Sequence, residues 1–523
     1  MGAIEVNGVA YAIPGGRTLF HDVSFRVGDG EHTALVGANG TGKTTLLRLI
    51  AGELDPTGGS TRVDGRALVM RQFAPADTTT VGDYLFEFAP TALRKARVEV
   101  ADAEAVFADA ASDGNGIRLA DAHQRFGDLG GWDIEVEWDV CSRAALGLPY
   151  DSVRERLVST LSGGEQKRLV LEYLLRSDAD VLLLDEPDNF LDVPAKRWLE
   201  SALRATTKTI LLVSHDRELL AVVADRIVTI EAKGAWVHGG SFATYRAARD
   251  ARLERLDEEH RRFQERRDQL EAQVAELRRR SQVTDAFSSR LRATKTKIEQ
   301  LDRIAPPERP KEQRIEMRLG GDRTGKRAVI IEGLELEGLT DPFDAEIFFG
   351  ERVGVIGRNG TGKSHFLRLL SGDAIDHAGD WRLGARVVPG YFRQLHDDAS
   401  FGERNLLELL LDANLSRGEA MATLRRYELH EQWNQPFSTL SGGQQARMQI
   451  LRLETSGSTL LLLDEPTDNL DLVSAEALEQ ALARFTGTVL LVTHDRWLMR
   501  SCDRYLIFGS DCRVTESLQP DYR

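Results

Sequence analysis

The sequence predicts an α/β protein made of two copies of one domain, with an antiparallel helical hairpin between them. Three observations lead to this fold class. The chain has 523 residues, which is more than a single hydrophobic core accommodates. Four short segments occur twice in the same order, which indicates an internal repeat. Between the two sets lies a charged stretch in which apolar residues return every seven positions, a spacing typical of helices that pack along their length.

Four pairs of segments define the repeat. GANGTGKT at 37–44, LSGGE at 161–165, LLLDEP at 182–187 and SHDR at 214–217 return as GRNGTGKS at 357–364, LSGGQ at 440–444, LLLDEP at 461–466 and THDR at 493–496. The distance between copies is 322 residues for Gln72 and Gln394 but 279 for Asp185 and Asp464, so the first copy holds 43 additional residues. We place this insertion near 85–128.

Each copy has the pattern of a parallel α/β domain. Apolar runs such as 33–36 and 181–184 lead directly into recurring polar motifs. Runs of this kind predict strands that are buried on both faces. We expect a first domain at 1–245, a linker at 246–324 and a second domain at 325–523.

The linker is predicted to be a helical hairpin. Leu256, Phe263, Leu270 and Leu277 follow one another at seven-residue intervals and predict a helix of roughly 35 residues. A turn is expected at 281–289, followed by a shorter helix that contains Leu291, Ile298 and Leu301. Pro306 and Pro307 would end that helix.

Composition narrows the classes of function. The net charge of −15 argues against general coating of DNA or RNA, so any RNA contact would have to be local. The three cysteines are far apart and have no metal-binding spacing. We find no run of about 18 apolar residues, which a membrane span would need. The N-terminal residues lack the basic and apolar regions of a signal peptide, so we expect a cytoplasmic protein without a membrane partner.

The two Gly-rich segments predict phosphate-binding loops. A GxxxxGK[ST] sequence between a strand and a helix surrounds phosphates with backbone N–H groups, its lysine reaches the outer phosphates, and its hydroxyl residue binds Mg²⁺. The candidate ATP-binding residues are Gly37, Ala38, Asn39, Gly40, Thr41, Gly42, Lys43, Thr44 and Thr45 in the first copy, and Gly357, Arg358, Asn359, Gly360, Thr361, Gly362, Lys363, Ser364 and His365 in the second.

The second recurring motif supplies carboxylates at strand ends. Asp185 and Asp464 follow apolar strands and are candidate Mg²⁺ ligands, together with Thr44 and Ser364. Glu186 and Glu465 come next and are candidate general bases for the attacking water. His215 and His494 each lie 29 residues beyond the glutamate. One histidine alone would be read as a core residue, but its repetition at identical spacing favours a contact to the γ-phosphate.

The LSGGE and LSGGQ segments resemble the signature sequence of ATP-binding-cassette proteins, and the other motifs follow in that family's order. The resemblance implies two cassettes docked head to tail, with each ATP held between the phosphate loop of one and the signature of the other. It pairs Lys43 and Glu186 with Ser441, Gly442 and Gly443, and Lys363 and Glu465 with Ser162, Gly163 and Gly164. It also assigns Gln72 and Gln394 to contacts with Mg²⁺ and nucleotide, Asp192 and Asp471 to the D-loops, and Tyr11 to stacking on adenine.

Three positions depart from the family pattern. The second copy has no aromatic residue at 334–338, Asp188 stands where threonine is usual, and His365 replaces the usual second threonine of the loop. Both glutamates are present, so we expect both sites to hydrolyse ATP, at unequal rates.

Tandem cassettes joined by a charged helical hairpin resemble the ABC-F family, whose members act on ribosomes. The resemblance implies a linker that reaches from the ribosomal E site toward the P-site tRNA, and an arm, here the insertion, near the L1 stalk. One chain supplies both cassettes, so a monomer is sufficient.

The linker charge is compatible with RNA contact. Residues 246–314 hold 19 Lys and Arg against 14 Asp and Glu. The candidate contacts to rRNA or tRNA are Arg278, Arg279, Arg280, Arg290, Arg292, Lys295 and Lys297. Composition alone favours a solvated helical face, whereas the position between two cassettes favours a phosphate-binding role.

Several functions remain open at this point. Within ABC-F, the short predicted tip of the hairpin favours a factor that regulates or rescues translation over one that displaces ribosome-targeting antibiotics. An ATPase subunit of a transporter with a separate membrane partner is a poorer alternative, because the hairpin would have no task there. A DNA-repair ATPase would need zinc-binding cysteines or much longer coiled coils. The two glutamates favour ATP turnover over a structural ATP sensor.

Overall fold

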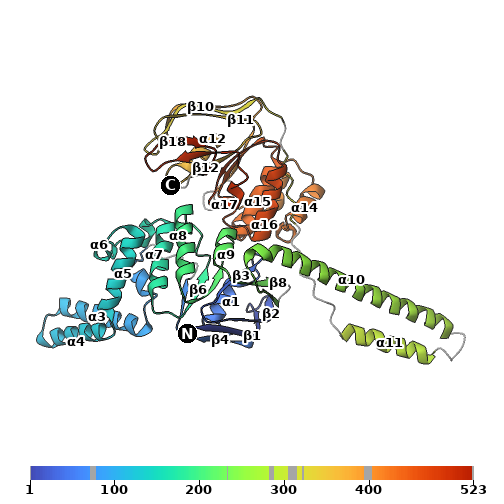
Figure 1. The fold of residues 1–523 in the computed structure, drawn as a ribbon, viewed down its shortest axis with the longest axis horizontal. Coiled ribbons are helices and arrows are strands. Elements are labelled where there is room, and N and C mark those ends of the chain that lie inside the picture. Colours follow the sequence, from blue (N-terminus) through green and yellow to red (C-terminus); the bar gives the residue numbers. More distant parts are fainter. Residues whose placement is uncertain are drawn as a thin grey trace.

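The protein is described by a computed structural model that covers residues 2–70, 78–231, 234–281, 288–303, 315–320, 323–393 and 403–520. Two α/β domains lie one above the other, and a long helical hairpin projects from the side of the pair (Figure 1). The predicted fold class is confirmed, since both domains have a six-stranded sheet, a three-stranded antiparallel sheet and surrounding helices.

In the first cassette, the six-stranded sheet has the strand order β5-β6-β7-β3-β8-β9. Five of these strands run parallel, and β9 pairs antiparallel with β8 at the edge. The strands are β3 (His32–Gly37), β5 (Ala67–Met70), β6 (Val181–Asp185), β7 (Thr209–Val213), β8 (Arg226–Glu231) and β9 (Gly234–His238). A second sheet is formed by β1 (Ala3–Ala12), β2 (Thr18–Val27) and β4 (Gly58–Asp64).

Two hydrophobic clusters cover the two faces of the large sheet. On one face, Leu183 and Leu211 pack with β1, β2 and helix α1 (Lys43–Ile50). On the other face, Leu182 and Leu212 pack with the helices of the first cassette. Because both faces are covered, every residue of β6 and β7 is buried. This explains their uninterrupted apolar sequences.

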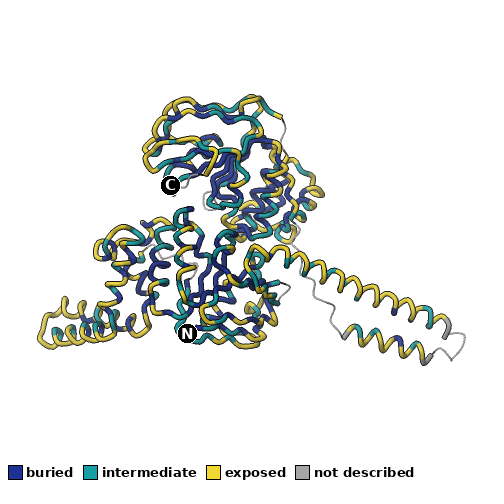
Figure 2. The backbone as a smooth tube through the Cα atoms, in the orientation of Figure 1, coloured by how far each residue is buried: buried dark blue, intermediate teal, exposed yellow. Residues whose placement is uncertain are grey.

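The other helices of the first cassette form a separate group on that second face. They are α2 (Val81–Phe86), α3 (Thr91–Asp109), α4 (Asp113–Asp128), α5 (Gly131–Leu146), α6 (Tyr150–Val153), α7 (Gly163–Arg176), α8 (Val193–Ala205) and α9 (Arg217–Val223). Helices α3 and α4 form a pair that extends away from the cassette and is largely exposed (Figure 2). They lie in the stretch where the sequence predicts the insertion.

The second cassette repeats this plan with fewer helices. Its sheets have the orders β14-β15-β16-β12-β17-β18 and β11-β10-β13. The strands are β10 (Arg327–Leu336), β11 (Phe343–Phe348), β12 (Arg352–Gly357), β13 (His377–Leu383), β14 (Pro389–Phe392), β15 (Leu460–Asp464), β16 (Thr488–Val492), β17 (Arg504–Phe508) and β18 (Val514–Ser517). The α-helices are α12 (Lys363–Ser371), α13 (Leu406–Leu411), α14 (Arg417–Arg426), α15 (Gly442–Thr455), α16 (Leu472–Arg484) and α17 (Arg496–Met499).

The hairpin consists of α10 (Phe242–Ser281) and α11 (Ser288–Arg303). Helix α10 has 40 residues, more than the roughly 35 expected from the heptads, because it begins at Phe242, within the stretch assigned to the first cassette. Leu270 and Val274 of α10 are buried, and Arg267 forms an ion pair of 3.5 Å with Asp302 of α11. Thr294 of α11 is also buried, and most of the other described residues of the hairpin are exposed (Figure 2).

The base of the hairpin touches both cassettes. Arg249 and Arg252 pair with Glu231 at the end of β8, and the Tyr245 hydroxyl lies 3.0 Å from the Thr229 hydroxyl. Arg246 forms an ion pair of 3.6 Å with Glu476 of α16, in the second cassette. Within the described residues, no helix is long and apolar enough to cross a membrane.

Candidate functional site: two composite nucleotide sites

Both phosphate loops lie between a central strand and a helix. The first runs from β3 into α1 and the second from β12 into α12. Gly42 and Gly362 have φ angles of +95°, so the turn that opens each helix requires glycine. Lys43 Nζ donates to the carbonyl oxygens of Gly37 at 2.8 Å and Ala38 at 3.2 Å.

Lys363 makes the equivalent bonds in the second loop, to Gly357 at 2.8 Å and Arg358 at 2.7 Å. Each lysine therefore lies across the mouth of its own loop, where backbone N–H groups and the helix start favour an anion. Burial lowers the pKa of both lysines. Nearby carboxylates oppose this shift, chiefly Asp471 for Lys43 and Glu465 for Lys363.

The strand-end aspartates have the features of ligands to a hydrated cation. One carboxylate oxygen of Asp185 and one of Asp464 are buried without a hydrogen-bond partner among the described residues. Asp464 Oδ2 accepts from the Tyr391 hydroxyl at 3.3 Å. The hydroxyl residues Thr44 and Ser364 act to lower the pKa of Asp185 and of Asp464, respectively. Burial raises the pKa of Asp185. It also raises the pKa of Asp464 to about 6, with the neighbouring Glu465 as the next cause. A carboxylate oxygen without a hydrogen-bond partner, beside the hydroxyl of Thr44 or Ser364, fits a Mg²⁺ ion with its water shell.

The two glutamates are held in unusual backbone conformations. Glu186 and Glu465 have φ angles of +50° and +48°, in the left-handed region that non-glycine residues rarely adopt. Each backbone N–H donates to the carbonyl of the last residue of the neighbouring strand, Val213 at 2.8 Å and Val492 at 2.9 Å. Both carboxylates are near enough to the loop lysines to act on them, Glu186 on Lys43 and Glu465 on Lys363, and to raise their pKa.

The carboxylates differ in their immediate partners. Asn189 Nδ2 donates to Glu186 Oε2 at 2.6 Å, whereas Glu465 Oε2 accepts from the backbone N–H of His494 at 2.9 Å. Burial raises the pKa of Glu465, and the His494 bond opposes this shift. A buried carboxylate with a raised pKa is a stronger proton acceptor for an attacking water.

The two histidines are half-buried at the strand ends. Burial lowers the pKa of His215 and of His494 to about 3, with the nearby loop lysine as the second cause. His494 Nε2 lies 3.1 Å from Asn359 Oδ1. Both ring nitrogens of His215 lack a hydrogen-bond partner among the described residues, so one of them can donate to a phosphate oxygen.

Each phosphate loop faces the opposite cassette. Asn39 of the first loop donates its backbone N–H to Asp471 Oδ2 at 3.1 Å and its side-chain amide to the carbonyl of Asn469 at 3.1 Å. A Cβ atom placed on Gly443 would lie only 2.4 Å from Asn39 Nδ2. The first loop thus meets the 441–443 signature, and together they form the first site.

The second site pairs the second loop with the 162–164 signature. Asn359 Nδ2 donates to the carbonyl of Phe190 at 3.3 Å, and a Cβ atom on Gly164 would lie 4.0 Å from this nitrogen. The contact is looser than in the first site. The signature serines begin helices α7 and α15, where Ser162 forms a reciprocal cap with Glu165 and Ser441 one with Gln444. Both helix starts present N–H groups to the loop opposite.

A family model described as "ABC transporter" matches residues 20–189 and 340–468, which is more than half of the chain. An "Antibiotic resistance protein" of Mycobacteroides abscessus is 50% identical over 100% of both chains. An Arabidopsis thaliana protein, "ABC transporter F family member 5", is 30% identical over 93% of this chain and 72% of its own. The chain belongs to the ABC-F family. A further relative, "Tylosin resistance ATP-binding protein TlrC" of Streptomyces fradiae, is 32% identical over 92% of both chains.

Membership of the family makes this chain an ATP-binding-cassette ATPase that binds nucleotide. The structure brings most of the sequence-predicted site residues to the two cassette interfaces. Gln72, Gln394 and the tip of the hairpin lie outside the described residues. Tyr11 lies on β1 with its ring 6.4 Å from that of Phe20. The stretch 334–338 of this ABC-F chain contributes no aromatic ring to the second.

Sequence reasoning missed a cluster of charged residues behind the sites. Lys196 of α8 forms an ion pair of 3.0 Å with Asp216. Burial opposes the charge of Lys196, but Asp216, Asp188 and Asp468 outweigh it and raise its pKa. Burial also raises the pKa of Asp188 and of Asp468. A comparison of the two repeats could have revealed this cluster. Two of its charged residues, Asp188 and Lys196, are replaced in the second cassette by the uncharged Thr467 and Ala475.

Proposed function

We propose that this ABC-F ATPase acts on the ribosome, and that ATP-driven docking of its cassettes positions the hairpin against ribosomal RNA or P-site tRNA. The observation that carries the proposal is the charge at the far end of the hairpin. Arg278 and Arg279 near the end of α10, and Arg290, Arg292, Lys295 and Lys297 on α11, are all exposed. Exposed Lys and Arg on a projecting element suit contacts to phosphates.

In this proposal, both sites bind ATP with Mg²⁺. Thr44 and Asp185 would hold the ion at the first site, and Ser364 and Asp464 at the second; Mg²⁺ supplies charge neutralisation to the phosphates. Glu186 and Glu465 accept the proton of the attacking water, and His215 and His494 donate to the γ-phosphate. One chain supplies both halves of each site, so the monomer is the working unit, and we place it in the cytoplasm with the ribosomes.

The test uses a protein that closes on ATP without hydrolysing it. In Glu186→Gln/Glu465→Gln, we expect ATP-dependent co-sedimentation with purified 70S ribosomes and a turnover lowered by about 10²–10⁴-fold, because a general base is lost. Reversing the charge of Arg290, Arg292, Lys295 and Lys297 to Glu in this protein should weaken ribosome binding. ATP binding should stay unchanged.

A matched control reverses four exposed arginines on the cassettes instead: Arg26, Arg62, Arg327 and Arg382. Both quadruple variants change the net charge equally. If the two variants bind ribosomes equally well at each salt concentration, the hairpin is a solvated helical face and the proposal is wrong.

A second candidate function is protection of the ribosome from antibiotics. The names of two relatives favour it, one an antibiotic resistance protein and one a tylosin resistance protein. The short predicted tip of the hairpin instead favours regulation or rescue of translation. The test is expression in a drug-sensitive bacterium, with the inhibitory concentrations of tylosin and of other ribosome-targeting drugs as readout. Resistance that disappears in Lys43→Ala/Lys363→Ala supports protection. Ribosome binding with unchanged inhibitory concentrations leaves regulation or rescue of translation.

A further inference from the structure

Two ion pairs cross between the cassettes and are copies of one another. Arg217 Nη1 lies 2.8 Å from Glu479 Oε2, and Arg496 pairs with Glu200, with Nη1 to Oε2 at 3.4 Å. Arg217 and Arg496 are separated by 279 residues, as are Glu200 and Glu479. The two pairs are therefore related by the internal repeat, and we call them latch 1 (Arg217 and Glu479) and latch 2 (Arg496 and Glu200).

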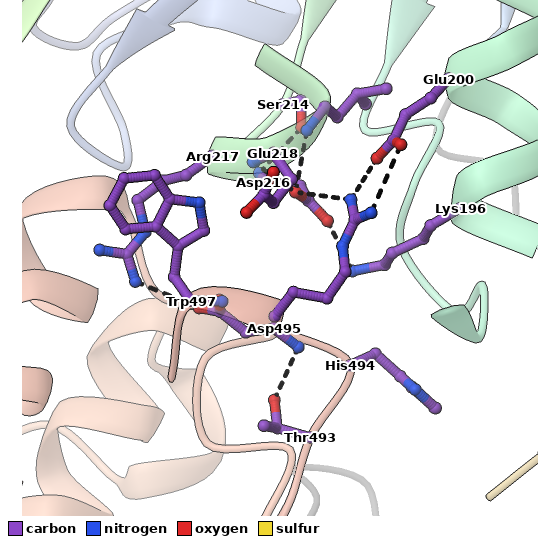
Figure 3. A network of polar contacts seen from close by, with 12 residues as sticks. Lys196, Glu200, Ser214, Asp216, Arg217, Glu218, Thr493, His494, Asp495 and Trp497 are labelled. Atoms are coloured by element: carbon purple, nitrogen blue, oxygen red, sulfur yellow. Dashed lines mark hydrogen bonds and ion pairs between the residues drawn. The ribbon is translucent and has the colours of Figure 1, made fainter. Parts of the chain in front are cut away.

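Each latch arginine also reaches an aspartate of the other cassette, and Figure 3 shows this for Arg217 and Asp495. Arg217 lies 3.5 Å from Asp495, and Arg496 lies 3.9 Å from Asp216. These aspartates cap the short helices that follow the histidines: Asp216 accepts the N–H groups of Glu218 and Leu219, and Asp495 those of Trp497 and Leu498. The arginines thus bind the opposite histidine turns as well as the opposite helices.

The latches lie directly behind the two ATP sites. Arg217 is two residues beyond His215, and Glu479 belongs to α16. Helix α16 is capped by Asp471, which accepts the backbone N–H of Asn39 in the first phosphate loop. Latch 1 therefore joins two elements of the first site that come from different cassettes. Latch 2 does the same for the second site, through His494 and the helix α8 that Asp192 caps.

Three of the four latch side chains are shielded from solvent. Those of Arg217, Arg496 and Glu200 are 5%, 13% and 11% exposed, whereas that of Glu479 is 35% exposed. Latch 2 therefore has little solvent contact and is hardly screened, whereas latch 1 is partly screened at Glu479. Removal of Arg496 leaves the shielded carboxylate of Glu200 without its cation. These pairs can form only while the cassettes are docked, because their partners belong to different cassettes.

We propose that Arg217 and Arg496 are positioning residues. Each docks the turn that follows the histidine of its own cassette against a helix of the other cassette, α16 for Arg217 and α8 for Arg496, so that each ATP site is completed when its latch forms. The inference rests on the ATPase activity of the family and is independent of the ribosome. The two latches are unequal. In latch 1, Arg217 lies 4.9 Å from the centre of the Trp497 ring, and Arg500 lies 5.2 Å from it.

Latch 1 also adjoins the hairpin. Glu476, three residues before Glu479 on α16, pairs with Arg246 at the base of α10 at 3.6 Å. Residues three apart lie on the same face of a helix. Docking at the first site therefore fixes the helix face that also contacts the base of the hairpin.

The experiment measures closure without hydrolysis. In the Glu186→Gln/Glu465→Gln protein, closure is followed by energy transfer between a dye on the exposed Cys512 and one on a cysteine introduced at Asp55, in a Cys502→Ser background. Arg217→Met and Glu479→Gln are each expected to raise the ATP concentration for half-closure on the order of tenfold, and the double variant by no more than the larger single effect. Arg217→Lys should restore part of the change.

The control is Arg504→Met, which removes an arginine as shielded as Arg496, with a side chain 13% exposed, that pairs with Glu351 inside the second cassette. It should lower thermal stability without moving the half-closure concentration. In proteins with intact glutamates, the latch variants should lower kcat and leave the ATP affinity of the open state, measured without Mg²⁺, unchanged. An unmoved half-closure concentration, or effects of Arg217→Met and Glu479→Gln that simply add, would overturn the proposal.

Discussion

The replacement Lys196→Ala should destabilise the first cassette strongly, and a second replacement, Asp188→Thr, should reverse most of that loss. Lys196 is a buried ammonium group 3.0 Å from Asp216, and the buried carboxyl of Asp188 and the carboxyl of Asp468 also act on it. Removing one member of a buried ion pair costs about 3–5 kcal/mol. For a domain of this size, that corresponds to a fall in melting temperature of roughly 6–20 °C.

The reversal follows from the second cassette, which has threonine and alanine at the equivalent positions, Thr467 and Ala475. There, the counterpart of Asp216 is Asp495, and its cation is an arginine of the other cassette, Arg217. Asp216 keeps the equivalent arginine, Arg496, when Lys196 is lost. We therefore expect the free energy of unfolding of Asp188→Thr/Lys196→Ala to lie within about 1 kcal/mol of that of the parent. Thermal unfolding followed by calorimetry or near-ultraviolet circular dichroism measures this difference.

The pH dependence has a definite sign. Burial raises the pKa of Asp188 and of Asp468, so their neutral forms favour folding at low pH, and that stability is lost as the pH rises through the raised pKa values. The penalty in Lys196→Ala should accordingly shrink between pH 7.5 and pH 5. Lys208→Ala is the control, because this lysine donates to the backbone carbonyls of Ser177 and Ala179. A double variant as unstable as Lys196→Ala alone would refute the reasoning.

Two further outcomes follow from the sites. Burial raises the pKa of Asp464 to about 6, so protons should compete with Mg²⁺ there. The Mg²⁺ concentration for half-maximal turnover in Glu186→Gln, where only the second site retains its base, should rise as the pH falls below about 6. A constant value from pH 5 to 7.5 would contradict this. Gly443→Ala and Gly164→Ala should both lower kcat, because each new Cβ would lie 2.9 Å from a backbone carbonyl oxygen, that of Asn469 or of Phe190. Gly443→Ala should have the larger effect, because its Cβ would also lie 2.4 Å from Asn39 Nδ2; the opposite order in steady-state assays would contradict the packing.

Much of the architecture was predictable because the repeat carries strong local signals. The phosphate loops, the strand-end aspartates and the heptads of α10 depend on residues close in sequence, and the structure places them as the pattern indicates. The start of α10 at Phe242 was not predicted, since Tyr245 and Arg249 are fixed by contacts with β8 and not by the heptads.

The latches were also missed, although their residues were visible at a 279-residue offset. Arg217 and Arg496 follow the histidine motif directly, and each is an ordinary charged residue by composition. Only the meeting of two cassettes shows that their partners are Glu479 and Glu200. Contacts between domains leave no periodicity in a sequence, so this part of the site required the structure.

The left-handed backbone at Glu186 and Glu465 means that the sequence needed for activity is not the most stable sequence for this fold. A non-glycine residue at a φ of +50° or +48° stores of order 1–3 kcal/mol of strain, which glycine would not. Selection for thermal tolerance alone would therefore be drawn to Glu186→Gly and Glu465→Gly, and would enrich heat-resistant proteins that no longer turn over ATP. Any engineering of this enzyme for higher thermal stability should keep glutamate at these two positions.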